Sequence, residues 1–113
     1  MMSLSQQSCE ACRKDAPLAS KTEKQQWLNQ LDNWQIVTVN GIEQLHKTYQ
    51  FKNFVEALAF TNHIGTLAEA NAHHPAITTE WGKVSVCWWT HKIKGLHKND
   101  FICAAQTDEL SLN

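Results

Sequence analysis

The dipeptide Asn40-Gly41 is the feature that most constrains the fold of this chain of 113 residues. Both residue types tolerate a positive φ angle, which the type I′ turn of a two-residue hairpin requires. The segment before it, 34–39, is rich in β-branched residues, and the segment after it, 42–49, alternates in polarity as strands do. We therefore predict an antiparallel hairpin around this turn.

A second hairpin is predicted around Trp81-Gly82, between a short strand over 77–80 and a longer strand over 83–91. The longer segment, KVSVCWWTH, alternates in a way that is typical of a strand with one buried face. Its partner is too short to have a clear pattern of its own, so the turn and the longer strand carry the prediction.

Two helices are expected before this second hairpin. Ser20 and Glu23 have the spacing of a capping box, so a first helix should cover 21–31. A longer helix should begin after Asn53, its N-cap, and continue to about residue 71, because apolar residues recur there every three or four positions. Pro75 prevents this helix from continuing, since the residue before a proline is driven towards extended geometry.

A third helix is expected over 97–110, where Asp100 is placed to reach back to the amide of residue 97 in a capping box. The element order is then α-β-β-α-β-β-α. Because hairpins pair antiparallel strands, we predict an α+β fold, a four-stranded antiparallel sheet with three helices on one face. Residues 20–113 should form this single domain, preceded by an irregular N-terminal segment over 1–19.

The composition argues against several classes of protein. Hydrophobic residues make up 42% and charged residues 19%, which is ordinary for a globular chain and unlike a disordered one. The net charge of −1 provides no basic surface for nucleic acid. No apolar run reaches the roughly 20 residues that cross a membrane, and the N-terminus lacks the apolar core of a signal peptide. We therefore expect a cytoplasmic protein.

The four cysteines do not make a recognisable metal site. Cys9 and Cys12 form a single C-x-x-C motif, whereas Cys87 and Cys103 lie far apart in the sequence. A structural zinc site would need a second ligand pair at similar spacing. A reducing compartment implies free thiols, and the role of the first pair stays open.

Three of the six histidines lie close together in the sequence, at His73, His74 and His91. The first two fall where the long helix should end, and the second hairpin could bring His91, at the end of its strand, back beside them. Imidazoles exchange protons near neutral pH, so three around one cavity could supply both a proton donor and an acceptor. Trp81 or Trp89 could form a wall for a flat heterocycle.

Competing interpretations apply to the same residues. Histidine is the commonest metal ligand, but neighbours in extended backbone point to opposite sides, so His73 and His74 would not easily share one ion. Asp100 could cap the third helix or orient a histidine of the cluster. Glu69 is unfavourable at a helix C-terminus, which slightly favours a functional role. The remaining histidines are expected to be surface or hydrogen-bonded core residues: His46, His63 and His97.

A motif extending from Glu69 to Asp100 resembles the signature of the pterin-4a-carbinolamine dehydratase family, bacterial type. Its members in this chain are Glu69, His73, His74, Pro75, Trp81, His91 and Asp100. The resemblance implies a lyase that converts 4a-hydroxytetrahydropterin to quinonoid dihydropterin and water. Such a dehydratase recycles tetrahydrobiopterin or a related pterin during phenylalanine hydroxylation. It implies no metal and no organic cofactor, because each step is a proton transfer.

The resemblance also implies roles for single residues. His73 and His91 match the general acids that protonate the leaving hydroxyl. His74 matches the residue that binds substrate and is a candidate base at N5. The other motif positions match supporting or substrate-binding residues: Asp100 and Glu69 in support, Pro75 and Trp81 at the substrate.

Partners are implied in the same way. Family members form homodimers or homotetramers, serve an aromatic amino acid hydroxylase, and in mammals act as a dimerisation cofactor for a homeodomain transcription factor. The alternative function is therefore an oligomeric binding or dimerisation module that acts on a transcription factor or a hydroxylase. The wide apolar arc of the long helix agrees with an oligomer contact. Neither direct nucleic-acid binding nor membrane binding is expected.

Overall fold

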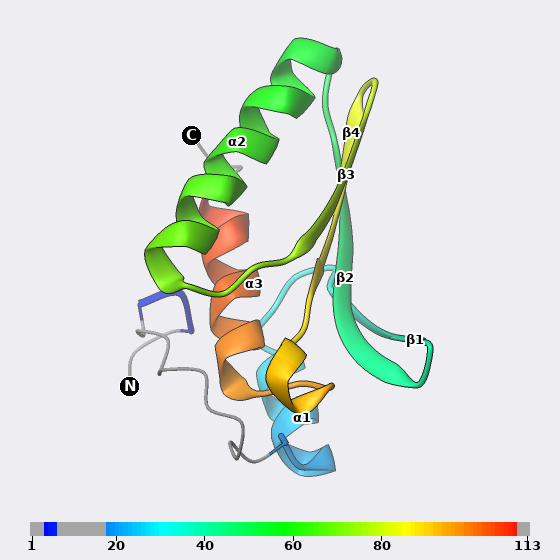
Figure 1. The fold of residues 1–113 in the computed structure, drawn as a ribbon, viewed down its shortest axis with the longest axis vertical. Helices are drawn as coiled ribbons and strands as arrows, with labels where there is room; N and C mark the ends of the chain where they lie inside the picture. The colour runs from blue at the N-terminus through cyan, green and yellow to red at the C-terminus, as the bar shows by residue number, and fades with distance from the viewer. Residues whose placement is uncertain (1–3, 7–17, 111–113) are drawn as a thin grey trace.

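The computed structural model describes residues 4–6 and 18–110, which form a twisted antiparallel sheet with helices packed on one of its faces (Figure 1). The elements in chain order are η1 (Leu4–Gln6), α1 (Lys21–Leu28), β1 (Gln35–Val39), β2 (Ile42–Gln50), α2 (Phe54–Asn71), β3 (Ala76–Glu80), β4 (Lys83–Trp88), η2 (His91–Ile93) and α3 (Lys98–Leu110). The predicted α+β class and the order of its main elements are confirmed. The two short 3-10 helices, η1 and η2, were not predicted.

Both predicted hairpins form, and they join through their second strands. Asn40 and Gly41 have φ angles of 52° and 77°, as a type I′ turn requires, and Gly82 has a φ of 76°. Strand β2 pairs with β4, so the sheet order is β1-β2-β4-β3 with β1 and β3 at the edges. In the β2–β4 ladder the last residue of β4, Trp88, pairs with Leu45 in the first half of β2.

Helix α1 begins as predicted and ends earlier. The Ser20 hydroxyl accepts from the Glu23 amide at 3.1 Å, and the Glu23 carboxylate accepts from the Ser20 amide at 2.9 Å, so the capping box is confirmed. The helix stops at Leu28, and the prediction that it reaches residue 31 is wrong. The chain turns there towards β1, and Asn33 adopts a left-handed φ of 64°.

Helix α2 has the predicted bounds. The Asn53 side chain accepts from the Glu56 amide at 2.9 Å at its start. At its end Ala72 adopts a left-handed φ of 50°, and the His73 amide donates to the Ala68 carbonyl at 3.1 Å. This is the hydrogen-bond pattern of a Schellman-type helix end, and it turns the chain sharply into β3.

Strand β4 is shorter than predicted. Val84, Val86 and Trp88 face the core as expected, but the strand ends at Trp88 and does not reach His91. The backbone of Thr90 instead pairs with Gly95, across a loop in which Lys94 has a left-handed φ of 53°. These local hydrogen bonds replace pairing with a neighbouring strand, so the chain leaves the sheet.

The core lies between the sheet and helices α2 and α3. Its largest fully buried apolar side chains come from β2, β4, α2, α3 and the loop before α3: Trp88, Phe101, Leu45, Ile64, Leu96 and Ile102. Leu4 is also buried against this core, so the segment predicted as irregular contributes a core residue. Cys9 and Cys12 lie outside the described residues. No helix among the described residues is long and apolar enough to cross a membrane.

A polar cluster ties the C-terminal half of α3 to the sheet. The Asp108 carboxylate accepts from the Trp34 indole at 3.0 Å, from the Lys47 ammonium at 2.7 Å and from the Tyr49 hydroxyl. Burial, together with this carboxylate, holds the pKa of Tyr49 far above its ordinary value. The cluster fixes α3 on the sheet and thereby the position of its N-terminal turn.

Candidate active site

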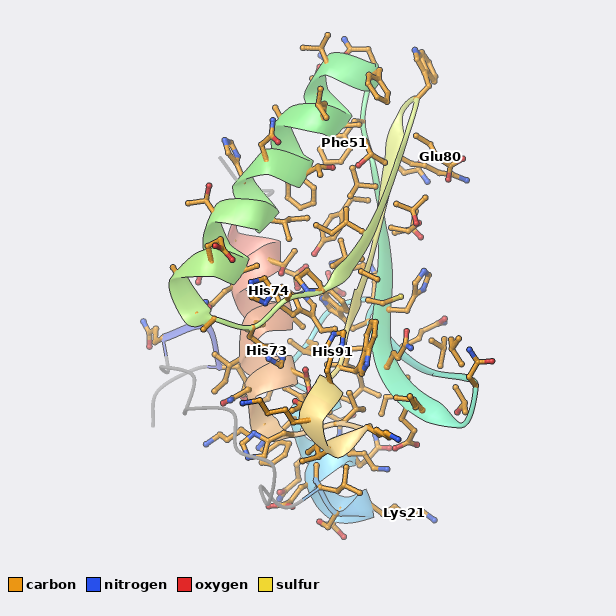
Figure 2. All side chains as sticks on the ribbon, viewed as in Figure 1. Lys21, Phe51, His73, His74, Glu80 and His91 are labelled. Atoms are coloured by element: carbon orange, nitrogen blue, oxygen red, sulfur yellow. The ribbon has the colours of Figure 1, made fainter. Side chains whose placement is uncertain are left out.

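The three predicted histidines border one hollow of about 210 Å³ between the end of α2 and η2. Figure 2 labels His73, His74 and His91 in this part of the molecule. Its lining residues are Ala72, His73, His74, Thr90, His91 and Lys92. The first three begin with the left-handed Ala72 directly after α2, and the last three come after the end of β4. The pairing of β3 with β4 brings these two segments together, as the hairpin prediction required.

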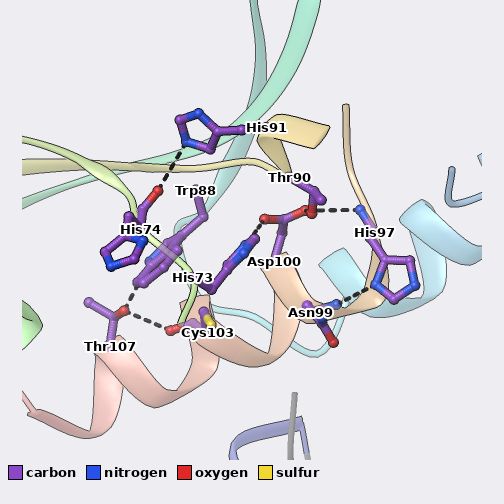
Figure 3. Close-up of polar contacts among 10 residues, drawn as sticks. All are labelled: His73, His74, Trp88, Thr90, His91, His97, Asn99, Asp100, Cys103 and Thr107. Carbon is purple, nitrogen blue, oxygen red and sulfur yellow. Dashed lines mark hydrogen bonds and ion pairs between the residues drawn. The ribbon is translucent and has the colours of Figure 1, made fainter. Parts of the chain in front are cut away.

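His73 is held rigidly inside the protein, where it is only 4% exposed. Its Nε2 lies 2.6 Å from Oδ1 of Asp100, and its ring stacks on that of Trp88 with centroids 5.6 Å apart and an interplanar angle of 6° (Figure 3). The indole of Trp88 donates in turn to the Thr107 hydroxyl at 3.1 Å. A carboxylate on one side and a fixed indole on the other leave the His73 ring little freedom to rotate.

Asp100 makes the contacts of both alternatives that the sequence left open, one with the start of α3 and one with His73. It is fully buried at N3 of α3, where Oδ2 accepts from the amide of His97 at 2.9 Å. The same Oδ2 accepts from the Thr90 hydroxyl at 2.8 Å, while Oδ1 faces His73. A buried carboxylate is costly unless it is hydrogen-bonded, and these donors satisfy it. His97 also caps the helix, because its Nδ1 accepts from the Asn99 amide at 3.2 Å.

His74 points the other way, as expected for neighbours in extended backbone. Its side chain is 60% exposed, and Nε2 lies 2.5 Å from Oε2 of Glu69, whose side chain is 78% exposed. Water screens such a pair strongly, so the contact contributes little to stability. Glu69 therefore accompanies His74 at the mouth of the hollow, whereas Asp100 supports His73 from within.

His91 lies on the opposite wall, at the start of η2. Its Nε2 is 3.1 Å from the backbone oxygen of His74. A carbonyl oxygen can only accept, so Nε2 carries the hydrogen, and in the neutral ring the lone pair lies on Nδ1. The ring stacks on Trp89 with centroids 4.3 Å apart, so Trp89 supports His91. Trp89 is not among the residues that line the hollow.

Trp81 does not reach this hollow within one chain. It is 73% exposed at the tip of the β3–β4 hairpin, and the five residues of β3 separate it from the histidines. A strand of that length spans about 17 Å, and Figure 2 shows Glu80 at the far end of the hairpin. The expected contact between Trp81 and a ligand among the histidines is therefore wrong for a single chain. Pro75 is half-buried beside His74 and is not a lining residue.

Three lining residues were not predicted from the sequence: Ala72, Thr90 and Lys92. Ala72 precedes His73, and Thr90 and Lys92 flank His91, so adjacency to a predicted histidine was the only signal that pointed to them. The described residues include no group of three His, Cys, Asp or Glu side chains arranged to hold a metal ion. Cys87, on the outer face of β4, is an unbridged thiol whose pKa is raised by burial.

Comparison with known proteins gives a consistent result. The family model described as pterin 4 alpha carbinolamine dehydratase matches residues 17–110. A protein of Syntrophotalea carbinolica named "Putative pterin-4-alpha-carbinolamine dehydratase" is 57% identical over 110 residues, which cover 97% of this chain and 98% of that one. A protein of the same name from Marinobacter nauticus is 58% identical, over 97% of this chain and 99% of its own.

Solved structures show the same similarity. A Brucella melitensis protein described as a transcriptional coactivator/pterin dehydratase superimposes with a TM-score of 0.75 at 28% identity, covering 83% of this chain and 98% of its own. A pterin dehydratase-like protein described as a RuBisCO assembly factor in the alpha-carboxysome has a TM-score of 0.60 at 21% identity, covering 71% and 90%. The second similarity concerns the fold alone.

Proposed function

The chain belongs to the pterin-4a-carbinolamine dehydratase family, and we propose that it dehydrates a 4a-hydroxytetrahydropterin in the hollow between α2 and η2. In this reaction the C4a–O bond breaks, the hydroxyl gains a proton and leaves as water, and N5 loses its proton. The new N5=C4a double bond gives the quinonoid dihydropterin. One observation carries the proposal: three imidazoles border one hollow, and a separate oxygen atom orients each.

His73 and His91 are the proposed general acids for the leaving hydroxyl. The Asp100 carboxylate fixes the orientation of the His73 ring and balances positive charge on it during proton transfer. The bond from His91 Nε2 to a backbone oxygen leaves Nδ1 of that ring as the atom that exchanges protons. The two rings come from different segments, His73 after α2 and His91 in η2, which suits protonation of the leaving hydroxyl from either side.

His74 is the proposed substrate-binding residue and base at N5. Its side chain is 60% exposed beside the hollow, so a ligand can reach it from solvent. Glu69 orients its ring through Nε2. The hollow is smaller than the roughly 300 Å³ at which pockets for drug-sized ligands begin, so it suits a small flat heterocycle whose substituent extends into solvent.

The test is a spectrophotometric dehydration assay on the purified protein. Wild type should accelerate loss of 4a-hydroxytetrahydropterin, also after exhaustive chelation, because we propose that no metal or organic cofactor takes part. His74→Ala should remove nearly all of this activity, since it deletes the proposed base. His63→Ala, an exposed position on α2, is the matched control and should keep it. Wild-type turnover by His74→Ala would contradict the assignment of His74.

We also propose that the protein is a homodimer or homotetramer. Phe54, Val55 and Leu58 of α2 are 44%, 76% and 43% exposed, and the exposed Trp81 lies nearby. The Phe51 amide donates to the Gly82 carbonyl at 2.8 Å, which holds the hairpin tip beside the start of α2. Contiguous exposed apolar side chains of this kind mark protein contacts. The same surface is also the candidate contact for an aromatic amino acid hydroxylase.

Light scattering should therefore give a mass of at least two chains. A triple variant with His73, His74 and His91 changed to Ala separates the enzyme from the alternative binding module. If the protein is an enzyme, the wild type dehydrates the pterin and the triple variant does not, in any oligomeric state. If the protein acts only by binding, the wild type has no dehydration activity and the triple variant still binds its partners. A monomer in solution would contradict the proposed assembly and leave the proposed chemistry standing.

A further inference from the structure

The Thr90 side chain has an unusual hydrogen bond for its position. Thr90 occupies the N-cap position of η2, where a threonine oxygen ordinarily accepts from an amide of the first helical turn. Its side chain makes no such bond. It is only 2% exposed, and its hydroxyl donates to Oδ2 of Asp100 at 2.8 Å (Figure 3). The hydroxyl is therefore directed at the carboxylate and away from its own helix.

The backbone around Thr90 holds this hydroxyl in place. The Thr90 amide donates to the Gly95 carbonyl at 2.8 Å, and the Gly95 amide donates back at 3.4 Å. Gly95 is packed closely against Leu18, because a Cβ atom at residue 95 would lie 2.5 Å from Leu18 Cδ2. The Thr90–Gly95 hydrogen bonds thus join the two ends of the loop over 91–95, and the Leu18 side chain packs against Gly95.

The two oxygens of Asp100 divide their partners. Oδ2 accepts from Thr90 and from the His97 amide, and Oδ1 faces Nε2 of His73 at 2.6 Å. The terminal torsion of an aspartate is broad, so one fixed donor does not by itself define the plane of the carboxylate. With two donors on Oδ2, the Thr90 hydroxyl and the His97 amide, the plane of the carboxylate is defined. The direction in which Oδ1 points is then set as well. We propose that Thr90 is a positioning residue that acts on His73 through Asp100.

This inference rests on the proposed function, because it concerns an imidazole that we place in the dehydration. Thr90→Val keeps the shape of the side chain and removes the donor, whereas Thr90→Ser keeps the donor. Loss of a hydrogen bond to a charged group changes an equilibrium or rate constant that depends on it by about tenfold. We expect Thr90→Val to lower kcat about tenfold with less than about a twofold change in KM, and Thr90→Ser to stay within about twofold of wild type.

Thr61→Val is the matched control. The Thr61 hydroxyl is partly buried and lies between α2 and β3, away from the hollow. It is 2.6 Å from the Thr79 hydroxyl and donates to the Ala57 carbonyl at 3.1 Å. Its loss should leave kcat unchanged. Thermal unfolding of all three variants shows whether each remains folded at the assay temperature.

A spectroscopic measurement tests the same inference without substrate. The Nε2 hydrogen of His73, buried against Asp100, should give a slowly exchanging NMR signal that is absent from His73→Gln. We expect the signal in wild type and Thr90→Ser, and its shift or loss in Thr90→Val. An unchanged signal with unchanged kcat in Thr90→Val would overturn the inference, as would equal impairment of both Thr90 variants. If wild type does not dehydrate the pterin, the proposed function fails, and the NMR signal still decides whether Thr90 orients the pair.

Discussion

Two imidazole–carboxylate pairs meet at the hollow, with similar separations and opposite surroundings. His73 and Asp100 are 2.6 Å apart and almost completely buried, whereas His74 and Glu69 are 2.5 Å apart and mostly exposed. A buried charge that loses its partner is strongly destabilising, but an exposed pair is screened by water. Burial, and not contact distance, therefore decides which of the two pairs contributes to the stability of the fold.

The largest expected effect comes from breaking the buried pair. Asp100→Asn places an amide NH₂ group among the donors of Thr90, His97 and His73, and it can satisfy them with only one oxygen. We expect the free energy of unfolding to fall by about 3 kcal/mol and dehydration to be largely lost. Urea unfolding followed by circular dichroism measures the first effect, and the dehydration assay measures the second.

Asp108→Asn is the matched control on the same helix. Asp108 also accepts from three donors, but its partners are Trp34, Lys47 and Tyr49 and it lies away from the hollow. This variant should lose stability while the folded protein keeps its turnover. If both variants lost turnover equally, the buried pair would have no special relation to the site, and the comparison would fail.

The smallest expected effect comes from the exposed pair. Glu69→Gln should change the free energy of unfolding by less than about 1 kcal/mol, because solvent already screens the contact. Turnover should fall by less than in Asp100→Asn, since His74 stays in place. The same urea titration and dehydration assay measure both effects. Wild type in high salt, which screens the exposed pair, should resemble Glu69→Gln in its free energy of unfolding. A stability loss as large as that of Asp100→Asn would show that exposure does not separate the two pairs.

Much of the fold could be predicted because its signals are local. The φ angles that Asn40-Gly41 favours, the capping box at Ser20 and the N-cap at Asn53 each depend on residues within one turn of chain. The opposite directions of His73 and His74 also follow from local backbone geometry. Such preferences act before any tertiary contact exists, so the sequence displays them directly.

The errors have a common physical cause. The alternation of β4 continues in the sequence past Trp88, but Thr90 pairs with Gly95 and the strand ends. Trp81 belongs to the motif that resembles the family signature, but the length of β3 separates it from the histidines. In both cases the outcome depends on which backbone groups pair and on where each strand ends, and periodicity does not contain that information.

The sequence by itself determined the turns, the caps, the element order and the set of histidines to which we assign the proposed chemistry. Only the tertiary structure decided how those histidines differ. It buried Asp100 where one carboxylate both begins α3 and holds His73, and it left Glu69 and His74 in solvent. The reason is that solvent exposure arises from packing between segments far apart in the chain, and exposure sets the strength of every charged contact.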